Sequence, residues 1–295
     1  KLNAYKSVQL VFVNALFSTE GGYNSLKTPE EKRRILDSAL RRMEELYHPD
    51  LLLIACNTLS ILYPGTDFAQ SASIPVLGIV DTGVEMMAEQ LKPDPEARII
   101  LFGTQTTITE NTHKKKLTQM GFLPDRIITQ ACPDLVPYIE KDHNSDETEM
   151  LILAYVDEAL QKRGEHTSHL YVCFGCTHYG YSLELWQKAF NQMGVEVAGF
   201  INPNRGLAHI FDRPSLRDRF ERTDLQTRVI SMVPIPEEAV SSLGEWLLSR
   251  SPDISRALRQ YEIIPDLFPW KPFVDKSRKI PIPRDDSLED MADWE

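Results

Sequence analysis

Two stretches of the chain decide its fold, Leu53-Ile54-Ala55-Cys56-Asn57-Thr58 and Val172-Cys173-Phe174-Gly175-Cys176-Thr177-His178. In each, an apolar run ends in a cysteine that small polar residues follow. Continuous apolar runs of this kind are typical of strands buried on both faces of a parallel sheet. We therefore predict that Cys56 and Cys176 each stand at the carboxyl end of a strand, close to the N-terminus of a helix.

Similar runs recur along the chain and alternate with amphipathic stretches. Strands are predicted over residues 8–14, 51–55, 76–80, 98–103, 126–130, 170–174, 196–201 and 228–232. The sequence Thr28-Pro29-Glu30-Glu31 is a capping box that opens a helix to about Tyr47. Further helices are predicted over 83–91, 107–120, 145–163, 183–193 and 237–248. This alternation predicts an α/β fold made of two doubly wound parallel-sheet lobes.

The boundary between the lobes is indicated by Lys92-Pro93-Asp94-Pro95-Glu96, which has the polar, proline-containing composition of a linker. We predict a discontinuous first lobe over 1–93 and 195–261 and a second lobe over 94–194. Residues 262–295 are predicted to be a C-terminal tail that is partly disordered or wraps the surface. Ligands bind beyond the carboxyl ends of strands in such sheets, so the site should lie in the cleft between the lobes.

The composition of the chain argues against some classes of binding partner. The chain of 295 residues has 32 basic and 43 acidic residues, a net charge of −11, which argues against nucleic acid. Its apolar runs are too short for a membrane-spanning helix, so no membrane partner is predicted. Four cysteines do not make a disulfide scaffold, and without a visible signal peptide they favour a reducing, cytoplasmic location. Because the chain begins with Lys1, we expect that it is trimmed or processed.

Cys56 and Cys176, the two cysteines predicted at strand ends, suggest an acid–base reaction. A helix N-terminus lowers the pKa of a nearby thiol because it stabilises the thiolate. One thiolate could take a proton from a carbon acid while a thiol on the opposite face returns one, which inverts a stereocentre without a cofactor. His178 could hold the proton of Cys176, and Asn57, Thr58 and Thr177 are donors that suit a carboxylate. A single active thiol would instead suit decarboxylation or acyl chemistry.

The other cysteines are predicted to be structural. Cys132 precedes a proline and lacks a cluster of donors, and Cys173 lies inside its strand. The Cys173-Phe174-Gly175-Cys176 motif lacks the second cysteine pair of a zinc site, so no metal is predicted. Nor does its first cysteine open a helix, as a thioredoxin-type site requires. The sequence contains neither the glycine-rich dinucleotide motif nor a phosphate-binding P-loop.

At these residues the chain resembles the aspartate/glutamate racemase superfamily, most closely the glutamate racemases. The resemblance rests on Ala55-Cys56-Asn57-Thr58 and on Gly175-Cys176-Thr177-His178-Tyr179 and is supported by Gly103-Thr104 and by 23–31. It implies cofactor-independent racemisation of glutamate, with Cys56 and Cys176 as the acid/base pair and His178 as auxiliary to Cys176. It also implies the substrate-binding residues Tyr23, Asn24, Ser25, Asn57, Thr58, Thr107 and Thr177. The product would feed peptidoglycan synthesis, and the partners considered are the amino acid and a second copy of the chain in a homodimer.

Three features depart from that family's pattern. The family begins with a strand that ends in Asp-Ser-Gly, so we interpret 8–14 as its second strand; either the first strand precedes Lys1 or the chain is a degraded relative. Gly180 replaces a common proline, and Ile201-Asn202-Pro203-Asn204 stands where an Asp-Ser pair is common. These departures leave two alternatives open. One is a racemase, decarboxylase or isomerase of another acidic substrate, and the other is a catalytically inactive binding or regulatory relative.

Overall fold

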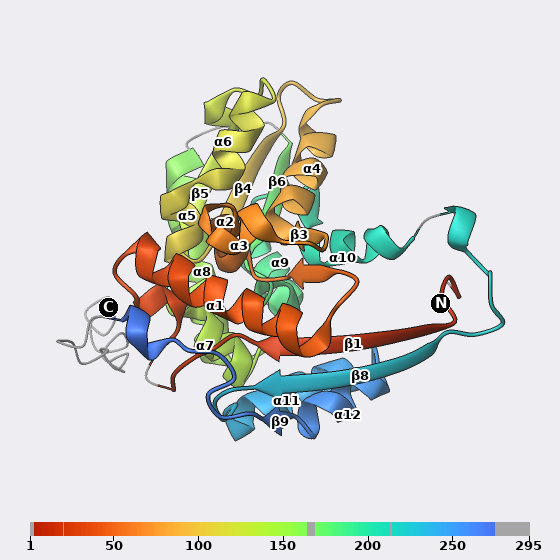
Figure 1. Cartoon of the computed structure of the whole chain (residues 1–295). Helices are drawn as coiled ribbons and strands as arrows, with labels where there is room; N and C mark the ends of the chain where they lie inside the picture. The colour runs from red at the N-terminus through yellow and green to blue at the C-terminus, as the bar shows by residue number, and fades with distance from the viewer. Residues whose placement is uncertain (1–2, 20, 164–168, 213, 275–295) are drawn as a thin grey trace.

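The computed structural model describes residues 3–19, 21–163, 169–212 and 214–274. It is an α/β structure with parallel strands throughout, in which β1 and β8 lie side by side in one lobe and β4, β5 and β6 stand in the other (Figure 1). The strands are β1 (Ser7–Asn14), β2 (Leu52–Ile54), β3 (Val76–Gly78), β4 (Arg98–Gly103), β5 (Ile127–Ala131), β6 (Leu170–Gly175), β7 (Gly199–Ile201), β8 (Asp224–Ser231) and β9 (Glu262–Ile263).

Helices separate most of these strands. The α-helices are α1 (Pro29–Tyr47), α2 (Asn57–Leu62), α3 (Asp67–Ser71), α4 (Ile79–Leu91), α5 (Gln105–Glu110), α6 (Thr112–Gln119), α7 (Leu135–Lys141), α8 (Asp146–Arg163), α9 (Leu183–Gln192), α10 (Pro203–Leu207), α11 (Glu237–Leu248) and α12 (Pro252–Arg259). The 3-10 segments are η1 (Tyr23–Ser25), η2 (Tyr63–Gly65), η3 (Pro124–Arg126), η4 (Tyr179–Ser182), η5 (Ala208–Phe211), η6 (Pro214–Leu216) and η7 (Lys271–Phe273). Within the described ranges, none of the helices combines the length and apolar composition that crossing a membrane requires.

The first lobe is built around α1, which begins at the predicted capping box. The Thr28 hydroxyl accepts a hydrogen bond from the Glu31 amide at 3.2 Å, and the Glu31 carboxylate accepts one from the Thr28 amide at 3.1 Å. The buried face of α1 packs on a core that includes Ile54 of β2 and Ile230 of β8. The strands of this lobe form two parallel sheets, one in the order β1-β8-β9 and the other of β2 and β3.

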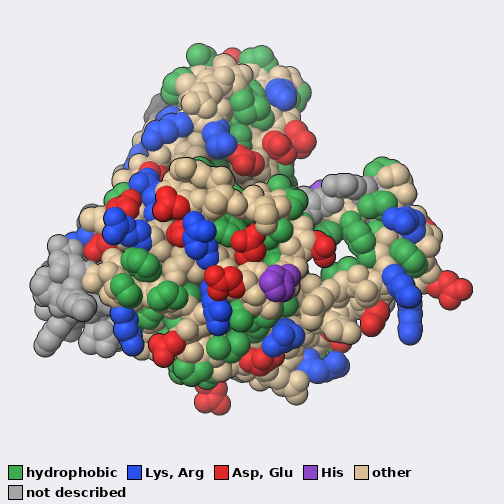
Figure 2. Space-filling view, viewed as in Figure 1, with side chains coloured by type: hydrophobic (Ala, Val, Ile, Leu, Met, Phe, Trp, Pro, Cys, Tyr) green, Lys and Arg blue, Asp and Glu red, His purple; other side chains and the backbone are tan. Residues whose placement is uncertain are grey.

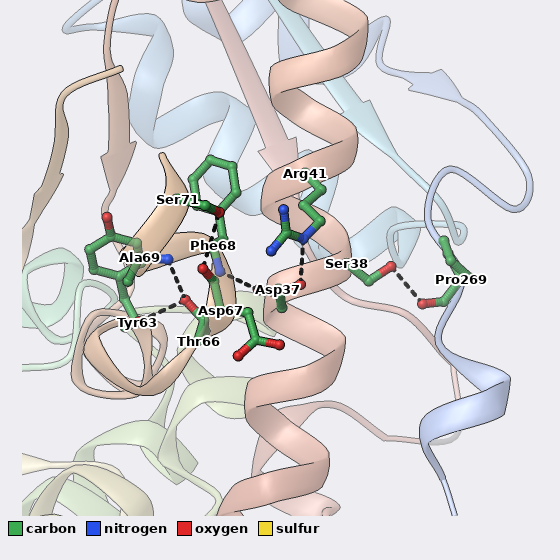
Figure 3. Close-up of polar contacts among 10 residues, drawn as sticks. All are labelled: Asp37, Ser38, Arg41, Tyr63, Thr66, Asp67, Phe68, Ala69, Ser71 and Pro269. Atoms are coloured by element: carbon green, nitrogen blue, oxygen red, sulfur yellow. Dashed lines mark hydrogen bonds and ion pairs between the residues drawn. The ribbon is translucent and has the colours of Figure 1, made fainter. Parts of the chain in front are cut away.

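The solvent-facing side of α1 carries charged residues of both signs, which are interspersed over this face of the molecule (Figure 2). Arg34 pairs with Glu30 at 2.7 Å, one turn earlier on the helix. The Asp37 carboxylate pairs with Arg41 at 2.8 Å and also accepts a hydrogen bond from the Phe68 amide at 2.5 Å (Figure 3). Asp37 therefore joins α1 to α3, while exposed pairs of the Arg34–Glu30 kind contribute little stability.

The second lobe contains one parallel sheet in the order β5-β4-β6-β7. Helices α7, α8 and α9 cover one face, and α4 and α6 cover the other. The linker before β4 is irregular, as predicted, and the Arg126 guanidinium donates hydrogen bonds to the carbonyls of Leu91, Asp94 and Ala97 at 2.6 to 2.9 Å. The lobe is thus doubly wound, and its strand order reverses between β4 and β6.

Several details differ from the sequence-based expectation. Residues 196–201 were expected in the first lobe, but β7 pairs with β6 because α9 returns the chain to that side of the sheet. The helix expected over 107–120 is interrupted at Asn111, whose left-handed backbone (φ 55°) ends α5. Ile79 and Val80 begin α4 instead of extending β3.

The predicted tail is partly docked. Its first residues form β9, which extends the β1-β8 sheet, and Leu267 and Phe268 are buried in the first-lobe core. The remainder of the predicted tail, 275–295, lies outside the described residues. Residues 262–274 therefore wrap the first lobe.

His113 of α6 is a buried histidine that should make the fold sensitive to acid. Its side chain is fully buried, and neither ring nitrogen has a hydrogen-bond partner among the residues that the structure describes. Burial lowers the pKa of His113 from its ordinary 6.5 to about 4. The folded state thus favours the neutral ring, and stability should fall as the pH drops from about 6.5 towards 4, because unfolding then takes up a proton.

His113→Leu should remove this dependence. Between pH 7 and pH 4.5 we expect the native chain to lose about 2.5 kcal/mol of unfolding free energy from this group, and the variant to lose that much less. Urea denaturation at the two pH values measures the unfolding free energy. His209→Leu, which replaces an exposed histidine, is the control. An identical pH dependence in the native and His113→Leu chains would contradict the prediction.

Candidate active site

The carboxyl ends of β4 and β6 form one side of the candidate site. Gly103 and Gly175 are register partners at the ends of these neighbouring strands. The strand order reverses here, and ligands of open α/β sheets bind beyond the carboxyl ends of the strands at such a reversal. Thr104 follows β4 and caps α5, and Cys176 follows β6. The sheet topology therefore places Cys176 beside the N-terminus of α5.

A chain of hydroxyl groups joins this edge to the first lobe. Thr104 Oγ1 lies 3.0 Å from Thr107 Oγ1 and 3.0 Å from Thr58 Oγ1, and all three side chains are buried. Thr58 is two residues beyond Cys56, which stands at the N-cap of α2 after β2. The carboxyl edges of the two lobes thus face each other, and Cys56 is brought towards Cys176.

Cys56 is exposed to solvent, whereas Cys176 is buried (8% exposed). The surrounding protein displaces enough water to raise the pKa of the Cys56 thiol, while the Leu59 amide at the start of α2 opposes this shift. The negative charge of Cys176 also raises the pKa of Cys56, and His178 lowers it. The expected net lowering by the helix end is therefore wrong for Cys56, because desolvation outweighs it.

Cys176 belongs to a three-residue relay. Its Sγ lies 3.8 Å from His178 Nδ1, and His178 Nε2 lies 2.9 Å from Glu140 Oε1. Burial by itself lowers the pKa of His178, but its hydrogen bonds with Cys176 and Glu140 outweigh that effect and hold the pKa well above its usual value. A protonated imidazole between a thiol and a carboxylate can pass a proton to Cys176 or stabilise its thiolate.

Two buried polar side chains, Asn57 next to Cys56 and Tyr23 in η1, lack partners among the described residues. Asn57 is 2% exposed, and neither atom of its amide has a hydrogen-bond partner there. The hydroxyl of Tyr23, in η1, is likewise buried without a partner. Burial raises the pKa of Tyr23, and the charge of Cys56 raises it further. Buried polar atoms of this kind are normally paired, so they suit a bound polar molecule.

The other predicted binding residues are spread around the same region. Ser25 donates a hydrogen bond from Oγ to the Gly22 carbonyl at 2.7 Å, which fixes the turn of η1, and Asn24 lies in the same segment. Thr107 is occupied by its bond to Thr104. The carbonyl of Thr177 accepts a hydrogen bond from Asn204 at 2.8 Å.

Two sequence departures meet beside Thr177. A side chain at Gly180 would collide with the amide of Asn202, so only glycine fits there while Asn202 keeps this position. Asn202 in turn caps α10, because its Oδ1 accepts a hydrogen bond from the Asn204 amide at 3.1 Å. Gly180 and Asn202 therefore pack directly against each other.

Sequence reasoning missed Glu140 and gave Thr104 no role. Glu140 lies on α7, a short helix that was not predicted, and is 38 positions from its partner in the sequence, so no local signal could have found it. Thr104 did carry a signal, since a threonine after an apolar strand is a favoured helix N-cap. As predicted, Cys173 is a buried residue within β6; it packs in the core on the opposite face of the sheet from Cys176.

Comparisons with known proteins show which family and which structures the chain is similar to. The family model described as Asp/Glu/Hydantoin racemase matches residues 8–198. A glutamate racemase from Persephonella marina is 30% identical over 149 residues, which is 50% of this chain and 52% of that protein. One from Sulfurihydrogenibium sp. is 33% identical over 134 residues, 45% of this chain and 48% of that protein. The chain thus spans about half the length of the curated relatives that it matches.

Solved structures share the fold. A glutamate racemase isoform from Bacillus anthracis has a TM-score of 0.60 at 18% identity, covering 92% of this chain and 89% of that one. The glutamate racemase from Francisella tularensis, solved with D-glutamate, has a TM-score of 0.58 at 18% identity, covering 82% of this chain and 94% of that one. At this level of identity the likeness establishes the two-lobed fold.

Proposed function

Because the chain belongs to the Asp/Glu/Hydantoin racemase family, we propose that it interconverts L- and D-glutamate by a two-thiol acid/base mechanism that needs no cofactor. The observation that supports this proposal is the 3.0 Å contact between Thr58, two residues beyond Cys56, and Thr104, which stands at the strand edge that carries Cys176 and its His178–Glu140 partners. Glutamate is favoured as the substrate because the matched relatives are named glutamate racemases.

In this mechanism the two thiols act on opposite faces of the substrate's Cα. The thiolate of one cysteine takes the Cα proton, and the thiol of the other donates a proton to the opposite face. The thiol and thiolate roles are then exchanged, so the enzyme returns to its first state by running the reaction in reverse or by exchanging protons with water. His178, held by Glu140, would keep the proton of Cys176 available.

Binding of the amino acid would use donors at the N-termini of α2 and α5. Asn57 brings a buried amide with no described partner, and Thr58 and Thr107 add hydroxyls. Tyr23 and the η1 backbone around Asn24 and Ser25 would close the other side, and Thr177 would contribute from the loop after β6. These groups suit carboxylates because helix N-termini and hydroxyls donate hydrogen bonds to anions.

The cysteines also bear on where in the cell the reaction would take place. The four cysteines are free, and thiols stay reduced in the cytoplasm, which favours a cytoplasmic location. There the D-glutamate would supply peptidoglycan synthesis. We further propose that the chain assembles as a homodimer, which sedimentation of the purified protein would test.

Solvent exchange at Cα tests the proposed reaction. The chain is incubated with L-glutamate, and separately with D-glutamate, in deuterated water. We expect deuterium at Cα and loss of optical purity from either enantiomer, because each thiol can remove its proton and the opposite thiol returns a deuteron. Proton NMR and chiral chromatography measure the two effects. Binding of glutamate without exchange from either enantiomer would contradict the proposal and favour an inactive binding protein.

A further inference from the structure

Helix α11 has no role in the reaction described above, although it contacts both lobes. It packs against α12, and α12 packs against β8 of the first-lobe sheet (Figure 1). It also packs against α7 of the second lobe, which carries Glu140. A helix of the first lobe is therefore in contact with the helix that provides Glu140 to His178.

Trp246 of α11 contacts a second element of that lobe, the 3-10 segment η4. The indole ring and the Tyr181 ring meet edge to face, with 4.6 Å between the ring centroids and 63° between the planes. The Arg250 guanidinium lies over the same indole, 3.6 Å from the ring centroid, and donates a hydrogen bond to the Trp246 carbonyl at 2.8 Å. These contacts hold the indole against Tyr181.

Tyr181 in turn contacts the imidazole of His178. The two rings meet edge to face, with 5.8 Å between the centroids and 87° between the planes. The Tyr181 amide donates a hydrogen bond to the His178 carbonyl at 2.9 Å, so the backbone also holds the two residues together. The phenol ring is therefore a third contact of the imidazole, besides the contacts of its two nitrogens with Cys176 and Glu140.

The imidazole needs such a support because its contact with the thiol is long. His178 Nδ1 lies 3.8 Å from Cys176 Sγ, and a hydrogen bond weakens quickly as its geometry departs from the optimum. A ring that could tilt would lose this contact before it lost the shorter one to Glu140, at 2.9 Å. A neighbour that fixes the plane of the imidazole therefore controls whether His178 can exchange a proton with Cys176.

We propose that Trp246 is a positioning residue, which acts through Tyr181 to hold the His178 imidazole against Cys176. This role rests on the proposed function and deepens it, because His178 is the group that would keep the proton of Cys176 available. Helix α11 thus joins the two lobes beside an acid/base residue, since it belongs to the first lobe and contacts both α7 and η4 of the second.

The test follows the protonation of His178. Its pH midpoint is measured from the Cε1–H signal in NMR spectra, which His178→Gln assigns by removing it. Hydrogen bonds with Cys176 and Glu140 raise the pKa of His178, so weakening them lowers the midpoint. Trp246→Leu and Tyr181→Leu, which keep the surroundings apolar, should each lower the midpoint by about one pH unit, a tenfold change in the ratio of protonated to neutral imidazole at a fixed pH. Trp246→Phe, which keeps a ring, should stay closer to the native value.

A double variant tests whether the two residues act in series. In the Tyr181→Leu background, Trp246→Leu should add no further shift, because its effect passes through Tyr181. Within the described ranges, the titratable groups that interact with the imidazole are Cys56, Glu140, Cys176 and Tyr181. Trp246→Leu leaves all of them in place, so a lower midpoint in that variant reports the position of the imidazole ring.

Leu247→Ala is the matched control, because Leu247 is a half-buried residue of the same helix that points to a different side of it from Trp246. An unchanged midpoint in Trp246→Leu, an equal shift in Leu247→Ala, or a full additional shift in the Tyr181→Leu background would each overturn the proposal. Near-ultraviolet circular dichroism checks folding, and Trp246→Met replaces Trp246→Leu in the comparison if the latter is unfolded. The titration needs no substrate, so a chain that fails to racemise glutamate still tests this inference.

Discussion

Alanine at position 56 or at position 176 is expected to reduce the interconversion of L- and D-glutamate by at least about 10³-fold. General acid–base catalysis by one positioned group contributes roughly 10²- to 10⁴-fold, and inversion needs such a group on each face of Cα. Each thiol is the base in one direction and the acid in the other, so losing either one should stop inversion in both directions. The rate is measured by chiral chromatography from each enantiomer separately.

Cys173→Ala provides the matched control for these variants. Cys173 is a fully buried cysteine of the same motif, but it lies within β6 and packs on the face of the sheet opposite Cys176. Its replacement removes a thiol without touching the proposed site, so turnover should stay within a few-fold of native. A Cys56→Ala or Cys176→Ala enzyme that retains a tenth of the native rate would refute a mechanism with two essential thiols.

Glu140→Gln should slow the reaction by about 10- to 100-fold, which is the effect of losing a hydrogen bond to a charged partner worth about 1.5–3 kcal/mol. The amide can keep the contact with His178 Nε2 but not the negative charge. Because Glu140 helps to raise the pKa of His178, the variant's imidazole should lose its proton at a lower pH. The alkaline limb of the pH–rate profile should accordingly move to lower pH.

The same substitution should also alter stability in a predictable direction. The pKa of His178 is higher in the folded chain than in the unfolded chain, so protonation of His178 stabilises the fold. This stabilisation is complete below the pKa of the unfolded chain and is lost as the pH rises through the pKa of the folded chain. Glu140→Gln should therefore destabilise the chain at pH 6 more than at pH 9, as measured by thermal unfolding. Glu149→Gln, which removes a pair with Lys188 in the same lobe, is the control and should leave the alkaline limb in place. If the alkaline limb of the pH–rate profile is unchanged in Glu140→Gln, Glu140 does not act on His178.

The elements that sequence reasoning located best are those with local causes. The capping box at Thr28 sets the start of α1 because its bonds join residues three apart. The apolar run of β4 has the bounds that were predicted, since a strand buried on both faces needs continuous apolar residues. By contrast, the predicted helix over 107–120 was divided, because Asn111 adopts a left-handed conformation that helical periodicity cannot reveal.

For the site, the sequence by itself indicated the two thiols on which the proposed chemistry depends. Cys56 and Cys176 were identified from short motifs, because the end of a strand and the start of a helix are encoded within a few neighbouring residues. The tertiary structure alone decided how these groups behave. It placed Glu140 on His178, joined Thr58 to Thr104 across the lobes, and raised the pKa of Cys56 instead of lowering it. Hydration and electrostatic interaction depend on distances through space, and the fold sets those distances between residues that are far apart in the chain.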